Sequence, residues 1–267
     1  MKALIRPEDL KNHISAFVVL DARFRLNDSR AGGRLFTQAH LPGAQYINLD
    51  TELSGAKTGT NGRHPLPNRA SLAAVFSKLG IGADTPVVVY DDADHSGAAR
   101  AWFLLRWMGH ENSFVLDGGL KVWNDLGYPT EVGAAKPRAP QVFPERAPLV
   151  EVVTKEEIAG LKLVDARAPE RYRGELEPID TKAGHIPGAE NLHFQKVFGA
   201  DGRFLKGEEL SAVLPKEKAA FYCGSGVTAA VLALASSVAD QPAALYVGSW
   251  SEYSSDPKNP VAKGDQP

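Results

Sequence analysis

Short apolar runs alternate along the chain with longer segments in which apolar residues recur at helical spacing. The apolar runs cover 18–20, 87–90, 161–166, 219–222 and 244–247, and such runs are typical of buried parallel strands. The helical segments cover 71–79, 98–108, 155–161 and 227–238. This alternation predicts an α/β fold built on mainly parallel sheets flanked by helices. In such folds, ligands bind beyond the carboxyl ends of the strands.

The chain contains two similar halves. Four segments of the first half return in the same order in the second: VVLDARF as LVDARAPERY, AHLPGAQYINLD as GHIPGAENLHFQ, VVVYDD as AAFYCG, and DGGLKVW as VGSWSEY. Chance similarity would not preserve the order of four separate segments, so we infer a duplicated domain.

A proline-rich segment joins the two halves. Residues 131–149 contain Pro137, Pro140, Pro144 and Pro148, and proline at this density is incompatible with a helix or a central strand. We therefore predict three parts: a first domain at 1–130, an extended linker at 131–149 and a second domain at 150–267.

Composition and charge narrow the class of protein. Of the 267 residues, 43% are hydrophobic and 23% are charged, which is the usual balance of a soluble globular protein. The formal net charge of −2 provides no basic excess against phosphates, so nucleic acid is not an expected partner. No apolar run reaches the ~18 residues of a membrane span, and the amino terminus lacks the apolar core of a signal peptide. We therefore expect a cytoplasmic protein that does not bind membranes.

The chain has a single cysteine, Cys223. One cysteine can form neither an intrachain disulfide nor a cysteine-built zinc site, and no metal or organic cofactor is indicated. Cys223 directly follows the apolar run 219–222 and begins the turn CGSGVT before a predicted helix. Such a turn directs backbone N–H groups inward at a helix amino terminus, where they stabilise a thiolate. The sequence therefore predicts a catalytic nucleophile, and a buried structural cysteine is the alternative.

Two kinds of chemistry use a cysteine in such a turn. Cysteine phosphatases hold the phosphate with an arginine of the loop, but no arginine occurs from 223 to 267. The short loop fits a single sulfur atom better than a tetrahedral oxyanion, so a persulfide (Cys–S–S⁻) on Cys223 is the favoured interpretation. A cysteine phosphatase and a non-catalytic persulfide carrier are the weaker alternatives.

These motifs resemble those of the two-domain rhodaneses, a superfamily of sulfurtransferases. The resemblance covers nearly the whole chain and rests on the D-A-R motifs, the HLPGA and GHIPGA turns, the DGGLKVW and GSWSEY segments and the loop CGSGVTA. That loop is similar to the form in 3-mercaptopyruvate sulfurtransferases, whereas the thiosulfate branch has arginine and lysine after the cysteine. The resemblance implies two tandem α/β domains with the nucleophile in the second. In the first, catalytically silent domain, Asp91 aligns with Cys223, and we expect acidic capping of the following helix there.

The resemblance also implies a residue that binds the substrate. Arg171, in the segment DARAPERY, matches the arginine that holds the anionic end of the donor, and a guanidinium suits a carboxylate bidentately. The mercaptopyruvate branch carries a second arginine after a Glu-Pro pair, but here Ile179 follows that pair. Arg173 and Lys182 are the candidates for the missing cation.

A serine–histidine–aspartate set follows from the same resemblance. Ser225 in the loop, His64 in GRHPLP and Asp50 in INLDTEL match a set in which the imidazole polarises the hydroxyl and the carboxylate orients the imidazole. The alternative is that His64 is an ordinary loop residue and Asp50 a turn former. His40 and His185 occur in matching turns of both halves, so we expect a structural role for them.

The expected reaction is a double displacement. Cys223 takes the sulfur of a small anionic donor, and the persulfide is stabilised by backbone N–H groups of the loop. These groups belong to Gly224, Gly226, Val227 and Thr228. Charge favours 3-mercaptopyruvate, a monoanion, because the loop contains no lysine or arginine, and transfer from the dianion thiosulfate to cyanide is the alternative. The expected acceptors are cyanide, a thiol, or a dithiol protein such as thioredoxin.

Overall fold

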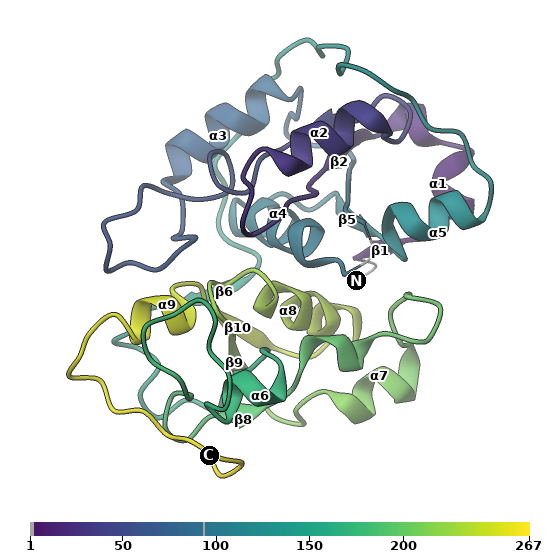
Figure 1. The fold of residues 1–267 in the computed structure, drawn as a ribbon. Helices are drawn as coiled ribbons and strands as arrows, with labels where there is room; N and C mark the ends of the chain where they lie inside the picture. The colour runs from purple at the N-terminus through teal and green to yellow at the C-terminus, as the bar shows by residue number, and fades with distance from the viewer. Residues whose placement is uncertain (1–2, 93) are drawn as a thin grey trace. The chain divides into compact units, whose positions relative to one another are not determined.

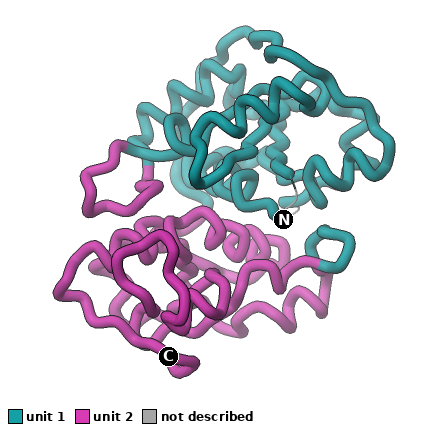
Figure 2. The backbone as a smooth tube through the Cα atoms, viewed as in Figure 1, with its two compact units in different colours: residues 1–55, 67–149, 199–204 teal, residues 56–66, 150–198, 205–267 magenta. Residues whose placement is uncertain are grey.

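The computed structural model describes residues 3–92 and 94–267, which form two compact units (Figure 2). Unit 1 comprises 1–55, 67–149 and 199–204, and unit 2 comprises 56–66, 150–198 and 205–267. Each unit therefore includes one short segment that comes from the other half of the sequence.

Unit 1 is built on a parallel five-stranded sheet in the order β1-β5-β4-β2-β3. Its strands β1, β2 and β5 are labelled in Figure 1. The strands are β1 (Leu4–Ile5), β2 (Val18–Asp21), β3 (Gln45–Tyr46), β4 (Val87–Tyr90) and β5 (Ser113–Leu116). The helices are α1 (Pro7–Lys11), α2 (Ala31–Gln38), α3 (Arg69–Lys78), α4 (Ser96–Trp107) and α5 (Gly119–Asp125), with a 3-10 turn η1 (Ile14–Ala16). Strands β2 and β4 are wholly buried, and α4 packs against β4 and β5.

Unit 2 repeats this architecture with its own parallel sheet in the order β6-β10-β9-β7-β8. The strands are β6 (Glu151–Val153), β7 (Leu163–Asp165), β8 (Glu190–Asn191), β9 (Ala219–Tyr222) and β10 (Ala243–Tyr246). The helices are α6 (Pro169–Tyr172), α7 (Gly207–Val213), α8 (Ala229–Val238) and α9 (Ser249–Tyr253), with a 3-10 turn η2 (Phe194–Val197). Helix α8 packs on β9 and β10, as α4 does on its two strands.

The two strand orders correspond position by position, which confirms the predicted duplication and the α/β fold. Each of the five apolar runs coincides or overlaps with a strand, namely β2, β4, β7, β9 and β10. Three of the four predicted helices are present as α3, α4 and α8.

The fourth predicted helix, at 155–161, is wrong. This segment forms consecutive turns instead. Two reciprocal hydrogen bonds close the first turn: the N–H of Thr154 donates to Oε2 of Glu157 at 2.8 Å, and the N–H of Glu157 donates to the carbonyl of Thr154 at 3.1 Å. Gly160 then takes a φ of +81°, which a right-handed helix cannot contain.

The proline-rich segment 131–149 contains no helix or strand beyond an isolated bridge between Glu131 and His40. It runs along unit 1, where the N–H of Gln141 donates to the carbonyl of Ser77 at 3.0 Å. The prolines thus lie in an irregular segment whose residues are counted with unit 1, and its role as a linker stays a prediction.

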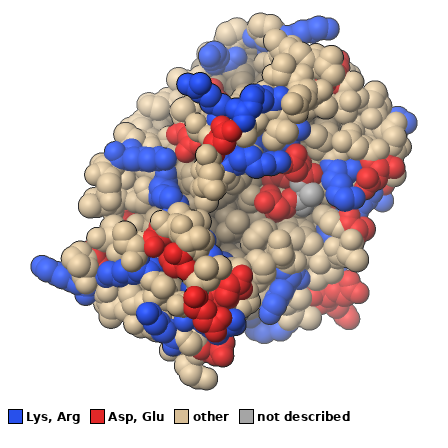
Figure 3. All heavy atoms as spheres, viewed as in Figure 1, with Lys and Arg blue, Asp and Glu red and all other residues tan. Residues whose placement is uncertain are grey.

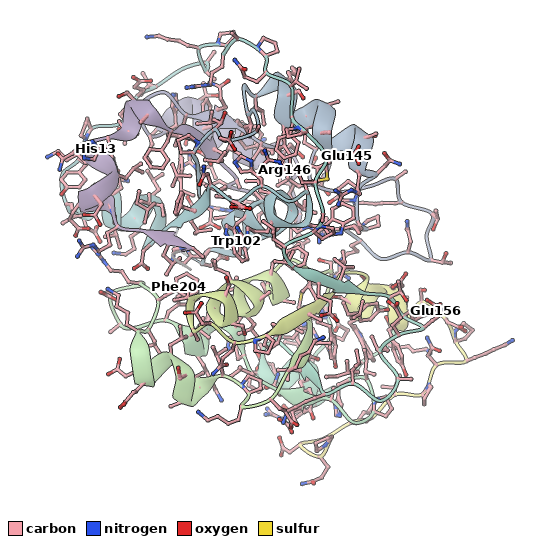
Figure 4. The ribbon with its side chains drawn as sticks, turned by 180° about the vertical axis from the view of Figure 1, so that it is seen from behind. His13, Trp102, Glu145, Arg146, Glu156 and Phe204 are labelled. Carbon is pink, nitrogen blue, oxygen red and sulfur yellow. The ribbon has the colours of Figure 1, made fainter. Side chains whose placement is uncertain are left out.

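The segment 199–204 is held on unit 1 by several contacts. The N–H of Phe204, labelled in Figure 4, donates to Oδ1 of Asp117 at 2.9 Å, and Arg203 forms an ion pair with Glu8 at 2.7 Å. The ring of Phe204 lies 5.1 Å from that of His95, centroid to centroid. A piece of the second half is therefore a packed part of the first compact unit.

The surface carries charged side chains of both signs, as the small net charge predicts. On the face drawn in Figure 3, acidic and basic side chains are interspersed. Within residues 3–92 and 94–267, every helix is too short or too polar to serve as a bilayer-spanning segment.

The D-A-R motifs fix the carboxyl ends of β2 and β7. In unit 2, Nη2 of Arg167 pairs with Oδ2 of Asp165 at 2.7 Å, and the Tyr222 hydroxyl at the end of β9 bonds the same carboxylate. Burial raises the pKa of Tyr222 well above its ordinary value, so the hydroxyl remains a donor. Asp21 and Arg23 form the equivalent buried pair in unit 1. Through Tyr222, the pair in unit 2 also contacts the end of β9, where the loop 223–228 begins.

Candidate active site

The loop 223–228 lies between the end of β9 and the start of α8, which is the position expected for a ligand site in a parallel sheet. Its backbone is tied to the start of α9. The carbonyl of Cys223 accepts from the N–H of Trp250 at 2.9 Å, and the carbonyl of Gly224 accepts from the N–H of Ser251 at 3.0 Å. Because these two carbonyls are directed toward α9, the loop has a defined conformation around the thiol.

The hydroxyl of Ser249 holds the first residue of the loop through hydrogen bonds. It accepts from the N–H of Cys223 at 3.1 Å and donates to the carbonyl of Tyr246 at 2.9 Å. Ser249 is buried and has a φ of +56°, a left-handed conformation that is unfavourable for a residue with a side chain. Gly119 takes a similar φ of +59° at the equivalent position of unit 1. The Ser249 hydroxyl thus connects the backbone of Cys223 to the carboxyl end of β10.

The thiol of Cys223 is directed into its own loop. Its Sγ accepts a hydrogen bond from the N–H of Gly226 at 3.2 Å, and Cys223 is only 2% exposed. Gly226 has a φ of +74°, and a Cβ there would lie 2.4 Å from the carbonyl oxygen of Val247, so only glycine fits. Val227 and Thr228 follow, and their carbonyls accept the first hydrogen bonds of α8. Sulfur therefore lies at the amino end of a ten-residue helix, where partial positive charge favours an anion.

Ser225 and His64 are in contact. Nδ1 of His64 lies 2.8 Å from Oγ of Ser225, and both side chains are buried. The contact forms because the segment 56–66 belongs to unit 2. The third member of the expected set, Asp50, belongs to unit 1, where its N–H donates to Oδ1 of Asn48 at 2.9 Å. The structure thus brings two of the three predicted residues together within one unit, and the role of Asp50 stays a prediction.

Arg171 lies in a network of buried charges. Its Nη2 donates to Oε1 of Glu177 at 2.6 Å and to Oδ2 of Asp180 at 3.3 Å, while Arg167 reaches Oε2 of Glu177 at 3.2 Å. Burial alone would raise the pKa of Glu177, but the hydrogen bonds from Arg171 and from the amide of Asp180 lower it below its ordinary value. Burial raises the pKa of Asp180, although the charge of Arg63 opposes that shift. The network fixes the direction of the Arg171 guanidinium.

The two candidates for a second cation lie elsewhere. Arg173 pairs with Glu175 at 2.8 Å on the surface. The ammonium of Lys182 donates to the carbonyls of Asp256 and Asn259 at 2.7 and 3.2 Å. Arg173 is therefore paired within its own segment, and Lys182 holds the segment 256–259.

Arg63 is a further cation beside the loop, and it was not among the residues predicted from the sequence. It precedes His64 in GRHPLP, forms an ion pair with Asp180 and approaches Gly224 closely. Its only signal in the sequence is its position beside a candidate site histidine. Like His64, it reaches the site because the segment 56–66 lies in unit 2.

Unit 1 carries a carboxylate where unit 2 carries the thiol. Oδ1 and Oδ2 of Asp91 accept from the N–H groups of His95 and Ala98 at 3.1 and 3.0 Å, and Oδ1 of Asp94 accepts from the N–H of Ser96 at 3.0 Å. Burial, together with the charge of Asp94, raises the pKa of Asp91 well above its ordinary value. The equivalent anion position is therefore already filled by a side chain.

His40 and His185 have matching surroundings in the two units. Nδ1 of His40 lies 2.8 Å from the carbonyl oxygen of Phe36, and Nδ1 of His185 lies 2.8 Å from that of Tyr172. Each imidazole also stacks on the ring of the same partner, at 3.9 and 3.8 Å between centroids. The repeated geometry supports the structural role expected for both.

Comparisons with known proteins cover both halves. The rhodanese-like domain matches residues 6–126 and 151–256. The chain is 44% identical over 258 residues to the Mycobacterium tuberculosis protein named "Putative thiosulfate sulfurtransferase SseB", covering 92% of this chain and 90% of that one. It is also 44% identical over 263 residues to the "Probable 3-mercaptopyruvate sulfurtransferase" of Pseudomonas aeruginosa, covering 93% of each. Among solved structures, the chain matches SseA from Escherichia coli, whose description concerns the fold and mechanism of 3-mercaptopyruvate sulfotransferases. The TM-score is 0.82, with 28% identity over 94% of this chain and 99% of that one.

Proposed function

Because the chain belongs to the family of rhodanese-like domains, we propose that it is a sulfurtransferase that works through a persulfide on Cys223. The observation that carries the proposal is the hydrogen bond from the N–H of Gly226 to Sγ of Cys223 at the amino end of α8. Backbone dipoles that stabilise one sulfur anion also suit the terminal sulfur of a persulfide.

The first step transfers sulfur from the donor to the enzyme. The thiolate of Cys223 attacks the sulfur of 3-mercaptopyruvate, an S–S bond forms, and the C–S bond breaks. The electron pair of that bond leaves with carbon as the enolate of pyruvate, which takes up one proton. With thiosulfate, the S–S bond of the donor breaks instead and sulfite leaves with the pair. No outside oxidant or reductant is required in either case.

The surrounding residues position the donor and its protons. The guanidinium of Arg171 holds the carboxylate of the donor in a bidentate arrangement. The hydroxyl of Ser225, polarised by His64 at 2.8 Å, faces the developing enolate and relays its proton. Asp50 orients His64 in the same proposal. The N–H groups of Gly224, Gly226, Val227 and Thr228 stabilise the persulfide.

The second step releases the sulfur. A thiophilic acceptor attacks the outer sulfur of the persulfide, the S–S bond breaks, and the thiolate of Cys223 leaves. Cyanide or a small thiol can act as acceptor. In a dithiol protein such as thioredoxin, one thiolate takes the outer sulfur, and the second thiolate then forms the disulfide and releases that sulfur as hydrogen sulfide. Chemistry of this kind needs free thiols, which fits a cytoplasmic location.

Charge supports 3-mercaptopyruvate as the donor. The loop 223–228 contains no lysine or arginine, and the guanidinium groups of Arg171 and Arg63 are balanced by Glu177 and Asp180. A site with little net positive charge suits a monoanion better than a dianion. Thiosulfate is the second candidate, because a relative at 44% identity carries its name.

We assign the chemistry to the second domain and propose that the first is catalytically silent. The side chain of Asp91 accepts the hydrogen bonds of the N–H groups at the equivalent position of unit 1, so these groups are not available to a second anion. The boundaries 1–130, 131–149 and 150–267 remain our proposal for the domains, with the addition that the segment 56–66 serves the second.

A donor comparison tests this function. The full chain is incubated with 3-mercaptopyruvate or thiosulfate, and intact-mass spectrometry measures the gain of one sulfur atom while thiocyanate formation from cyanide measures turnover. We expect a persulfide with either donor at high concentration and a higher kcat/KM with 3-mercaptopyruvate. Persulfide without turnover would instead support a carrier, and hydrolysis of an aryl phosphate without persulfide would support a phosphatase.

A further inference from the structure

Two guanidinium groups converge on the backbone directly after the proposed nucleophile. A Cβ added to Gly224 would lie 2.6 Å from Nη2 of Arg63 and 3.5 Å from Nη1 of Arg171. Both arginines therefore lie against the first residue after Cys223. From this convergence we infer that Arg63 binds the anionic end of the sulfur donor together with Arg171, an inference that rests on the function proposed above.

Arg63 has a donor that the protein leaves unused. Its Nη1 pairs with Asp180, whereas its Nε is buried and has no hydrogen-bond acceptor among the residues that the structure describes. A buried donor without an acceptor is unfavourable, and a carboxylate is the acceptor whose shape matches a guanidinium. Arg63 and Asp180 also line a hollow of about 410 Å³, so the pair is reached from outside the core of unit 2.

Asp180 links the two arginines. Its Oδ1 pairs with Arg63 and its Oδ2 lies 3.3 Å from Nη2 of Arg171, and its side chain is only 7% exposed. One carboxylate thus holds both guanidinium groups at a fixed separation, which makes Asp180 a positioning residue. Because it neutralises part of their charge, the pair favours a donor with a single negative charge at its anionic end.

The segment 56–66 delivers Arg63 and His64 to neighbouring positions of one loop. The N–H of Arg63 donates to Oγ of Ser251 at 3.0 Å, which fixes the segment on α9, and the next residue, His64, contacts Ser225. Consecutive residues therefore supply a cation beside Gly224 and an imidazole beside the hydroxyl. Arg63 provides the second cation that Ile179, 41% exposed and uncharged, cannot provide.

Steady-state kinetics of the full chain test this role, with 3-mercaptopyruvate as donor and cyanide as acceptor. Arg63→Gln removes the charge, and we expect KM for the donor to rise about tenfold or more, as for other hydrogen bonds between charged groups, with a much smaller change in kcat. Arg63→Lys keeps the charge but loses the planar fork, so an intermediate KM is expected. Arg173→Gln is the matched control, because this arginine pairs with Glu175 away from the loop, and its KM should equal that of the wild type.

A KM for Arg63→Gln equal to that of Arg173→Gln would overturn the inference. Melting temperatures of all three variants show whether they fold. If Arg63→Gln does not fold, Arg63→Lys decides, and a wild-type KM for this folded variant overturns the inference.

Persulfide formation separates this inference from the function on which it rests. Wild-type protein treated with saturating donor is expected to gain one sulfur atom on Cys223. If it gains none, the proposed function fails. If it does gain the atom while the Arg63 variants keep the wild-type KM, the function stands and only the role of Arg63 fails.

Discussion

The imidazole of His64 and the hydroxyl of Ser225 lie 2.8 Å apart, although 161 positions separate them in the chain. The contact forms within unit 2 because a segment of the first half of the chain folds there. In the proposed reaction, the imidazole and hydroxyl act as one proton relay, so removing either should stop the same step.

The relay predicts non-additive kinetics. We expect Ser225→Ala and His64→Gln each to lower kcat by about 10²-fold, the usual contribution of a positioned acid or base. The double variant should lose little more than the worse single variant, because the two groups serve one step. Measured kcat values for the three variants, each checked for its melting temperature, test this. Losses that multiply would show that the two residues act independently.

Replacement of the nucleophile should abolish transfer without unfolding the protein. In Cys223→Ser the hydroxyl can still accept the hydrogen bond from Gly226 but cannot form a persulfide, so we expect turnover to fall by at least about 10³-fold. Thiocyanate formation and the melting temperature are the two measurements. Retained turnover would remove Cys223 from the mechanism, and a large fall in melting temperature would support a structural cysteine.

A cation added to the loop should change the choice of donor. Ser225→Lys adds positive charge beside the thiol and removes the hydroxyl that contacts His64. We expect the kcat/KM for the dianion thiosulfate to rise and that for 3-mercaptopyruvate to fall. Parallel kinetics with the two donors give the ratio, and an unchanged ratio would contradict the charge argument.

Ser249 should matter more for its hydroxyl than for its unusual backbone. Ser249→Ala keeps the strain of a φ of +56° and leaves the buried N–H of Cys223 without its acceptor, so we expect a loss of about 1–3 kcal/mol in the free energy of unfolding. Ser249→Gly loses the same bond but relieves the strain, so its loss should be smaller. Denaturant titrations of both variants decide, and equal losses would argue against backbone strain at this position.

The carboxyl of Asp91 should make stability depend on pH. Its pKa is raised by burial, so the folded protein holds a proton there at pH values where the unfolded chain has lost it. The free energy of unfolding should therefore increase as the pH falls through the folded pKa toward the unfolded value of about 3.9, and decrease as the pH rises. Asp91→Asn has no such titration and should flatten this slope. Denaturant titrations across the acidic range measure it, and identical slopes would contradict the prediction.

The sequence was informative about the fold where local patterns are strong. Runs such as 87–90 and 219–222 are apolar throughout, and they became the central strands β4 and β9. The edge strands β1, β3 and β8 have only two residues each, which is too short for any periodicity. The helix expected at 155–161 did not form, because local hydrogen bonding by Glu157 closes a turn.

The candidate site could be predicted only where its residues are close together in the sequence. Cys223 and Ser225 share one loop, so their neighbourhood is readable from consecutive residues. Arg63 could not be predicted because its partner Asp180 is 117 positions away in the sequence. No local sequence pattern indicates that the segment 56–66 packs in unit 2. The resemblance predicts a second arginine near position 179, whereas the second cation that we propose, Arg63, belongs to the segment 56–66.

The segments 56–66 and 199–204, each of which lies in the compact unit of the other half, have an evolutionary consequence. A protein that began at the proline-rich segment would lack 56–66, and with it His64 and Arg63, while one that ended there would lack 199–204. Each half of the sequence thus contributes one segment to the compact unit of the other half. A gene divided between the two halves would therefore encode two products that each lack a segment of their compact unit.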